Sequence, residues 1–235
     1  MRFVAVGELL VDVLAQGSGH EARIRLEPAG SAFNTSVAAR AAGADTTVIG
    51  TVGDDPAGRL ILTELEARGV RTEVRVANGP TGTFLLSGGE VRVDCGVAHD
   101  LVLPERIDAD VVLVSGYVPA AAEALARAHA EWVALDAANR VDLPPGGNAV
   151  FASGPQHVLE QLAEGRRLAV VTQGPRGAVA MLDGQIGRVA PTRVVEDGPG
   201  AGDAFAATLL VALARGDELT AALSEAGRAA LDSLA

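Results

Sequence analysis

The sequence predicts an α/β protein in which a mostly parallel sheet carries helices on both faces and a small β insertion lies at one side. Short apolar segments of strand character alternate with segments of helical apolar spacing along most of the 235 residues. Between residues 71 and 97 the pattern changes to alternating polar and apolar residues, which is typical of half-buried antiparallel strands. Because parallel strands need crossover helices, these observations together predict a three-layer α/β/α architecture.

The strands and helices of the main layers alternate in chain order. Predicted strands are short apolar runs at 3–6, 46–52, 111–114, 132–136, 149–152 and 168–172. Predicted helices have apolar residues at three- and four-residue spacing over 33–41, 57–68, 120–130, 156–163, 201–215 and 219–234. The second helix is followed by Gly69, a typical C-terminal stop. Residues 178–182 and 186–189 flank Asp183-Gly184 and are predicted to form a hairpin.

The segment 71–97 is predicted to form a small sheet on the side of this domain. Residues 73–76 and 90–93 alternate polar with apolar side chains, and Gly88-Gly89 suits a tight turn. A chain of 235 residues has room for one sizeable core, and it contains neither an internal repeat nor a low-complexity linker. We therefore expect a single domain over residues 1–235.

The composition argues against several classes of partner. The formal net charge is -11, and a field of this sign repels nucleic acids and anionic membrane surfaces. The apolar helical run 204–214 is too short to span a bilayer. Cys95 is the single cysteine, so no internal disulfide can form, which fits a reducing compartment. We expect a cytoplasmic protein with neither nucleic-acid nor membrane partners.

Residues 196–205 carry the strongest chemical signal. Three glycines and a proline precede an apolar helix there, so successive backbone N–H groups can turn toward one anion, for which phosphate is the natural candidate. Asp203 falls in the first helical turn, where it can accept a proton from a hydroxyl group beside that anion. The structural alternative is that glycine turns before helices are common and that Asp is a good N-terminal helix residue.

This stretch and a second one resemble a known family. Gly200-Ala201-Gly202-Asp203, with Asp197 upstream, resembles the C-terminal signature of the ribokinase family of carbohydrate kinases, also called the PfkB family. Residues 28–34 and 38–43 resemble its N-terminal signature, and residues 53–58 follow at the usual distance. Two signatures in the right order are more specific than either one alone.

The resemblance implies a ribokinase-like sandwich with a small β lid, whose strands would come from about 12–26 and 71–97. It also implies an ATP-dependent enzyme that uses Mg²⁺, although it assigns no metal-ligating residue in this chain. The implied substrate-binding residues are Asp12, Gly30 and Asn34. The implied nucleotide-binding residues are Thr172, Gly174, Gly177 and Asp197. Gly200, Ala201 and Gly202 would hold the transferring phosphate, and Asp203 would act as the base.

Two further segments refine the resemblance. Residues 135–140 resemble a strand end of fructokinase-like and 2-keto-3-deoxygluconate-kinase-like members, in which Arg140 would point toward the substrate and would suit a carboxylate. The alternative is that Arg140 is a solvated loop residue. Ser153 and Gln156 stand where the family usually has an Asn-x-x-Glu pair tied to magnesium and phosphate, so we expect weaker metal binding here.

We therefore predict an enzyme, a carbohydrate kinase that phosphorylates a hydroxyl group of a sugar or sugar acid with ATP. A nucleoside kinase of the adenosine type is one alternative, since it would share the fold and the motifs. A second alternative is a sugar-binding protein of the same fold without turnover, and a third is a nucleotide-binding structural module. Lid strands with a free edge also predict a possible homodimer through the lid.

Overall fold

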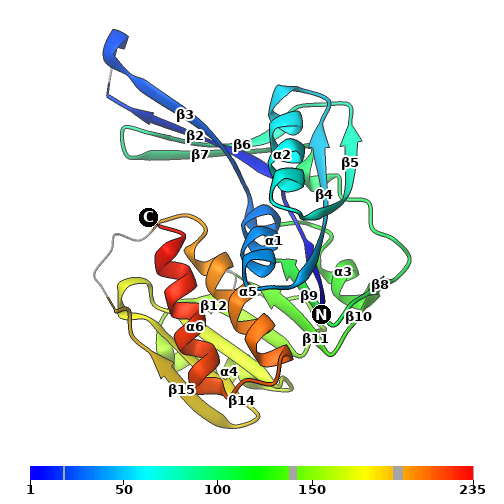
Figure 1. Ribbon diagram of the computed structural model, residues 1–235, viewed down its shortest axis with the longest axis vertical. Helices are drawn as coiled ribbons and strands as arrows, with labels where there is room; N and C mark the ends of the chain where they lie inside the picture. The colour runs from blue at the N-terminus through cyan, green and yellow to red at the C-terminus, as the bar shows by residue number, and fades with distance from the viewer. Residues whose placement is uncertain (18, 138–141, 193–197, 235) are drawn as a thin grey trace.

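The computed structural model describes residues 1–17, 19–137, 142–192 and 198–234 (Figure 1). Within these residues, nine strands form one large sheet in the order β15-β14-β13-β12-β11-β9-β1-β4-β5. The strands are β1 (Arg2–Val6), β4 (Asp45–Gly53), β5 (Arg71–Ala77), β9 (Val111–Ser115), β11 (Trp132–Asp136), β12 (Ala149–Ser153), β13 (Leu168–Thr172), β14 (Ala178–Leu182) and β15 (Gln185–Val189). The seven strands from β5 to β13 pair in parallel, while β14 and β15 are antiparallel at one edge. The predicted mostly parallel sheet is confirmed.

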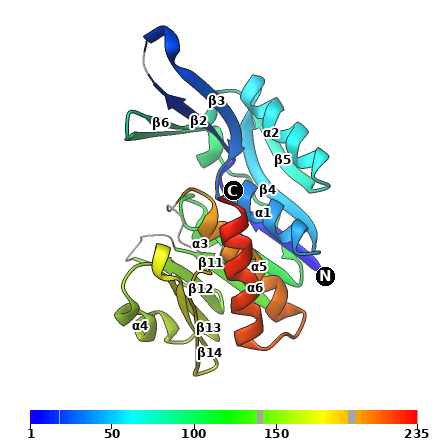
Figure 2. The ribbon, with the colours of Figure 1, turned by 60° about the vertical axis from the view of Figure 1, so that its left-hand side comes forward.

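Helices cover both faces of this sheet, as Figure 2 shows. One face packs against α1 (Ser31–Ala41), α2 (Pro56–Ala67), α5 (Ala201–Ala214) and α6 (Leu219–Asp232). The other packs against α3 (Ala121–Arg127) and α4 (Leu159–Ala163). Successive residues of β1 supply the two cores in turn, with Phe3 and Ala5 in the first and Val4 and Val6 in the second. The predicted three layers are therefore present.

Helix α5 holds a central position because it is apolar on nearly all sides. Its residues from Ala204 to Leu213 are buried, in contact with the sheet, α1 and α6. A helix that is hydrophobic all round cannot lie on the surface. Its first turn is consequently held in one place by the core, and this turn carries the predicted catalytic residue.

A second sheet projects from the large one and is called the lid here (Figure 1). Its four described strands have the order β3-β2-β6-β7. They are β2 (Leu10–Gln16), β3 (Arg23–Ala29), β6 (Thr81–Ser87) and β7 (Glu90–Gly96). Residues 71–77 form β5 and pair in parallel with β4, so the expectation that all of 71–97 contributes to the lid is corrected. An edge strand with one exposed face shows the same alternation as an antiparallel lid strand, and the pattern alone does not name its partner.

Two predicted helices are shorter than expected. Helix α3 ends at Arg127, and the next two residues form β10 (Ala128–His129), which pairs with β8 (Ile107–Asp108). Residues 156–158 form a 3-10 turn before α4. No helix among the described residues has both the length and the apolar character needed to cross a bilayer.

Candidate active site

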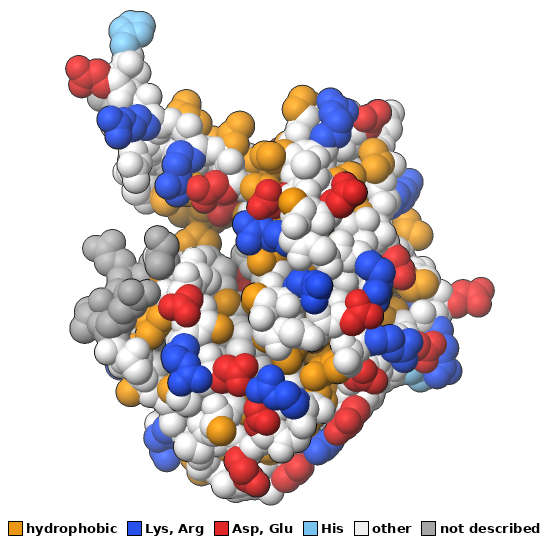
Figure 3. All heavy atoms as spheres, viewed as in Figure 1, with side chains coloured by type: hydrophobic (Ala, Val, Ile, Leu, Met, Phe, Trp, Pro, Cys, Tyr) orange, Lys and Arg blue, Asp and Glu red, His pale blue; other side chains and the backbone are white. Residues whose placement is uncertain are grey.

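A cavity of about 490 Å³ lies between the lid and the C-terminal ends of the parallel strands. We call it the acceptor cavity. Figure 3 shows the lid standing away from the body of the molecule, with a hollow beneath it. The cavity brings together predicted residues from distant parts of the chain, namely Asp12, Gly30, Asn34, Gly200, Gly202 and Asp203. Open parallel sheets commonly bind ligands at this edge.

Asp203 is held in the acceptor cavity by two hydrogen bonds from α1. The Ser31 hydroxyl donates to its Oδ1 at 2.7 Å, and the Asn34 side-chain amide donates to its Oδ2 at 3.0 Å. Ser31 and Asn34 are three residues apart on a helix, so their side chains share one face. The side chain of Asp203 keeps partial exposure to the cavity. Both carboxylate oxygens therefore have fixed directions.

The surroundings of Asp203 disfavour its charged form. Burial raises its pKa, and the nearby negative charge of Asp136 and, to a lesser degree, of Glu8 raises it further. The hydrogen bonds from Asn34 and Ser31 oppose this, and the net pKa of Asp203 is about 8. A carboxyl group with such a pKa in a cavity is typical of functional sites.

Glu8 is a site residue to which the sequence assigned no role. Its side chain is 6% exposed and accepts hydrogen bonds from the backbone N–H of Ser31 at 3.1 Å and from the Ser115 hydroxyl at 2.7 Å. Burial raises its pKa, although these hydrogen bonds oppose the shift. Glu8 thus ties the start of α1 to the end of β9. The signal in the sequence was an acidic residue in an otherwise apolar stretch right after the first strand.

Asp12 reaches the acceptor cavity from the lid. It lies on β2, directly opposite Glu27 of β3 and Phe84 of β6. Burial, followed by the negative charge of Glu27, raises the pKa of Asp12 to about 6. Phe84 and Val93 line the same cavity. The lid therefore offers the ligand one carboxylate within a mainly apolar surface.

The start of α5 leaves backbone N–H groups outside the hydrogen bonding of the helix. Gly200 precedes the helix with φ 86°, a left-handed conformation that favours glycine, and it contributes no side-chain cap. The first helical hydrogen bond is donated by the Ala204 N–H to the Gly200 carbonyl at 2.9 Å. The earlier N–H groups of a helix have no partner within it, and together they attract negative charge. This is the geometry that the glycine pattern predicted.

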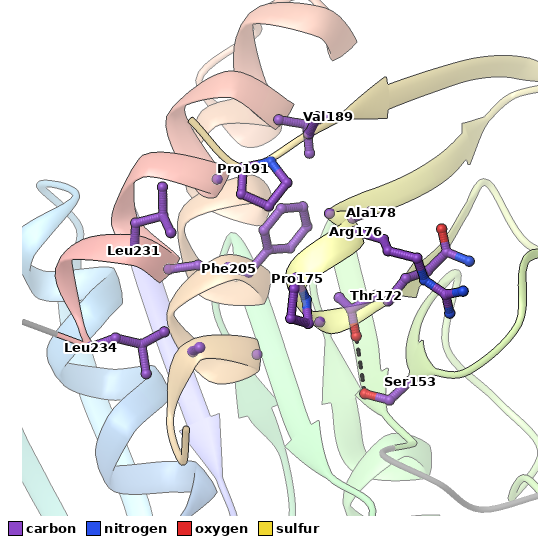
Figure 4. A pocket seen from close by; sticks show the side chains of 18 of the residues that line it. Ser153, Thr172, Pro175, Arg176, Ala178, Val189, Pro191, Phe205, Leu231 and Leu234 are labelled. Carbon is purple, nitrogen blue, oxygen red and sulfur yellow. Dashed lines mark hydrogen bonds between the residues drawn. The ribbon is translucent and has the colours of Figure 1, made fainter. Parts of the chain in front are cut away.

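A second cavity, of about 530 Å³, adjoins the first and is called the nucleotide cavity here. It contains the predicted residues Thr172, Gly174 and Gly177. Figure 4 shows that Phe205 of α5, Leu231 and Leu234 provide much of its apolar wall. An apolar wall of this kind suits a flat heterocycle.

The two cavities meet at Ser153, Thr172 and Gly202, which line both of them. The hydroxyl groups of Ser153 and Thr172 are 3.0 Å apart, within hydrogen-bonding distance, at the ends of β12 and β13 (Figure 4). A group bound in one cavity can therefore reach a group bound in the other near the first turn of α5.

Comparison with known proteins shows the family of this chain. The model of the pfkB family carbohydrate kinases matches residues 2–141 and 148–231. The chain belongs to this family. A ribokinase of Bacillus subtilis (strain 168) is 30% identical over 86% of this chain and 80% of its own. An adenosine kinase from Sinorhizobium meliloti superposes with a TM-score of 0.82 at 20% identity, covering 99% of this chain and 93% of that one. An E. coli protein classed as ribokinase II, in complex with ATP and Mg²⁺, superposes with a TM-score of 0.79 at 18% identity. The match covers 100% of this chain and 93% of that one.

The family confirms the predicted fold class, and it makes this PfkB protein a kinase, that is, a phosphotransferase. Two predicted site residues, Arg140 and Asp197, lie outside the residues that the structure describes. Gln156 forms part of the 3-10 turn before α4 and lines neither cavity among the described residues. No cluster of three or more His, Cys, Asp or Glu side chains suited to a metal ion occurs in the described part of the chain.

Proposed function

We propose that this protein transfers the γ-phosphoryl group of ATP to a hydroxyl group of a sugar or sugar acid, with Asp203 as the general base. The observation that carries the proposal is the position of Asp203, which lies in the acceptor cavity and in the first turn of α5, beside Gly200 and Gly202. A base, an anion site and an acceptor cavity thus share one place at the boundary between two cavities.

The proposed reaction follows from these positions. An acceptor hydroxyl held near Asp12 and Asn34 gives its proton to Asp203 while its oxygen forms a bond to the γ-phosphorus, and the bond from that phosphorus to ADP breaks. The backbone N–H groups of Gly200, Ala201 and Gly202 stabilise the negative charge on the transferring group. Ser31 and Asn34 keep the carboxylate of Asp203 directed toward the cavity.

The residues of the nucleotide cavity fit ATP in its chemistry. Thr172, Gly174 and Gly177 would lie along the nucleotide, and the apolar wall around Phe205 would contact the base. Mg²⁺, when bound, would neutralise charge on the phosphates. Because the described residues include no metal-binding cluster, we infer that phosphate oxygens and water would provide most of its ligands. At the boundary between the cavities this chain offers the neutral hydroxyl groups of Ser153 and Thr172.

A nucleoside acceptor is the second candidate, because the apolar lining of the lid suits a nucleobase too. The inner side of the lid brings Leu10, Phe84 and Val93 to the acceptor cavity, and Tyr117 lines it from the loop after β9. Aromatic and aliphatic side chains of this kind can stack on a nucleobase as well as on the C–H face of a sugar. The structural similarity to an adenosine kinase is compatible with either acceptor, since at 20% identity it concerns the fold.

The lid also supports a proposal on assembly. We propose that residues 1–235 form one domain whose lid closes over the acceptor, and that two lids pair in a homodimer. The side chains of Ile24 and Leu26 on β3 are 65% and 59% exposed. Large exposed apolar side chains on an edge strand are typical of surfaces that pair with another chain.

One experiment tests the reaction and the acceptor together. ADP release is measured with Mg²⁺ and ATP across sugars, sugar acids and nucleosides, for the wild type and for Asp203→Asn. We expect turnover with at least one sugar or sugar acid, and a kcat at least about 10²-fold lower in the variant, since a general base contributes roughly 10²- to 10⁴-fold. Unchanged kcat in Asp203→Asn rejects the base assignment. Turnover confined to nucleosides selects the second candidate.

A further inference from the structure

The base of lid strand β6 is tied to the start of α2 by a group of hydrogen bonds centred on Asp55. Asp55 is the N-cap residue of α2, and its Oδ1 accepts from the Gly58 N–H at 2.8 Å. The same oxygen accepts from the Thr81 hydroxyl at 2.7 Å, and Oδ2 accepts from the Thr81 N–H at 2.7 Å. The Thr81 hydroxyl in turn accepts from the Gly53 N–H at 2.9 Å. We call these four residues the lid anchor.

The lid anchor is more than a helix cap. A cap needs one side-chain oxygen for an N–H group of the first turn, and Gly58 provides that contact. The second oxygen of Asp55 is directed at another element, because Thr81 is the first residue of β6 and is 4% exposed. The two hydrogen bonds that Asp55 accepts from Thr81 therefore hold the lid and not the helix.

The backbones at the anchor are in direct contact. A Cβ atom on Gly58 would collide with the Gly53 carbonyl oxygen, and one on Gly53 would collide with the Gly79 carbonyl oxygen. Glycine at these positions lets the end of β4, the start of α2 and the segment before β6 lie closer than side chains would allow. The contact leaves little room for the base of β6 to shift.

Partial burial raises the pKa of Asp55, but the hydrogen bonds from Thr81 and Gly58 more than offset this and lower it below its ordinary value. The carboxylate is thus charged at neutral pH, and hydrogen bonds to a charged acceptor are stronger than those between neutral groups.

The anchor lies on the same strand as residues of the acceptor cavity. Phe84 follows Thr81 by three residues on β6, a distance of about 10 Å at roughly 3.3 Å per residue. Phe84 is also the direct neighbour of Asp12 on β2. A change in the direction of β6 at its base would therefore displace both cavity residues.

We propose that Asp55 is a positioning residue, which fixes Thr81 as the pivot of the lid so that Phe84 and Asp12 meet the acceptor when the lid closes. The inference rests on the proposed function, since it assigns the lid a part in acceptor binding. Asp55 itself lines neither cavity among the described residues.

Asp55→Ser separates the two tasks of this side chain. Serine is a good N-cap residue and keeps one acceptor oxygen for Gly58, but it lacks the oxygen that accepts from the Thr81 N–H. Thr81→Val removes the hydroxyl from the other side with nearly the same shape. Asp54→Asn is the matched control, because Asp54 is the adjacent carboxylate, has a 79% exposed side chain and pairs with Arg59 on the surface.

Kinetics and hydrogen exchange give independent results. With a looser lid the closed state is less populated, so we expect the acceptor KM to rise roughly ten-fold in Asp55→Ser and in Thr81→Val. The KM for ATP should stay within about two-fold of the wild type. ATP hydrolysis without acceptor should increase, because a lid that closes poorly excludes water less well. Backbone amides of β6 and β7 should exchange faster in both variants, and Asp54→Asn should match the wild type throughout.

An acceptor KM that is unchanged in Asp55→Ser, or a parallel rise in both KM values together with a lower Tm, overturns the proposal in favour of a purely structural cap. If the wild type phosphorylates no acceptor, the proposed function fails. Exchange of the lid amides still decides the anchor in that case, because unchanged protection in both variants rejects it without any need for activity.

Discussion

Replacing Asp203 by asparagine should stabilise the folded protein at alkaline pH, although it removes the proposed base. The wild-type carboxyl group has a pKa of about 8 in the fold because of burial and of the charges on Asp136 and Glu8, against an ordinary value of 3.8. A folded-state pKa above the unfolded value means that the folded protein binds the extra proton. The contribution of this carboxyl group to the free energy of unfolding is therefore fully present below about pH 4, and it is lost as the pH rises through about 8. Asparagine is neutral at every pH and avoids this loss.

The size of the effect follows from the shift. A difference of about 4 pKa units corresponds to at most roughly 5–6 kcal/mol at 1.36 kcal/mol per unit. The side chain is partly exposed and its charge is shared with neighbouring carboxylates, so we take about half of this, roughly 2–3 kcal/mol, at pH 8. With an unfolding entropy of about 2.1 cal/mol/K per residue, a chain of 235 residues would gain about 4–6 °C in Tm.

Thermal unfolding of both proteins between pH 4 and pH 8 measures this difference. Other carboxyl groups, such as Glu8, titrate in both proteins, so the quantity of interest is the gap between the two Tm curves. The gap should be small at pH 4 and should widen steadily to pH 8, while Asp54→Asn should follow the wild type within about 1–2 °C. A gap that is independent of pH, or a variant less stable than the wild type at pH 8, would refute the electrostatic account of Asp203.

Two further predictions concern the lid. Glu27→Gln removes the charge opposite Asp12. kcat/KM for the acceptor should fall as Asp203 gains its proton near pH 8, and it should fall more steeply near pH 6, where ionised Asp12 is lost as well. In the variant this second step should move to lower pH. A pH profile that does not move would show that Asp12 is not the group responsible. Leu26→Glu places a charge on the exposed face of β3, and light scattering should find a dimeric wild type and a monomeric variant. A monomeric wild type contradicts the proposed assembly.

The sequence by itself determined the layers of the fold and the turn at the centre of the site. Buried parallel strands are apolar on both faces and alternate with amphipathic helices, so the pattern names the architecture without any knowledge of contacts. The glycines before α5 likewise predicted open N–H groups and an aspartate in the first turn, since both are local properties of a short segment. The resemblance to the PfkB family then supplied the roles of residues such as Asn34 and Thr172, which no local pattern indicates.

Only the tertiary structure decided which segments meet. It placed 71–77 in the large sheet, because the polar and apolar alternation of a strand states which side is exposed but not which strand is its neighbour. It showed that the Ser31 hydroxyl is hydrogen-bonded to Asp203, 172 positions away in the chain. It also showed that the Glu8 carboxylate accepts a hydrogen bond from the Ser31 N–H. The raised pKa of Asp203 belongs to this level as well, since desolvation and the charge of Asp136 depend on distances in space that the order of residues does not contain.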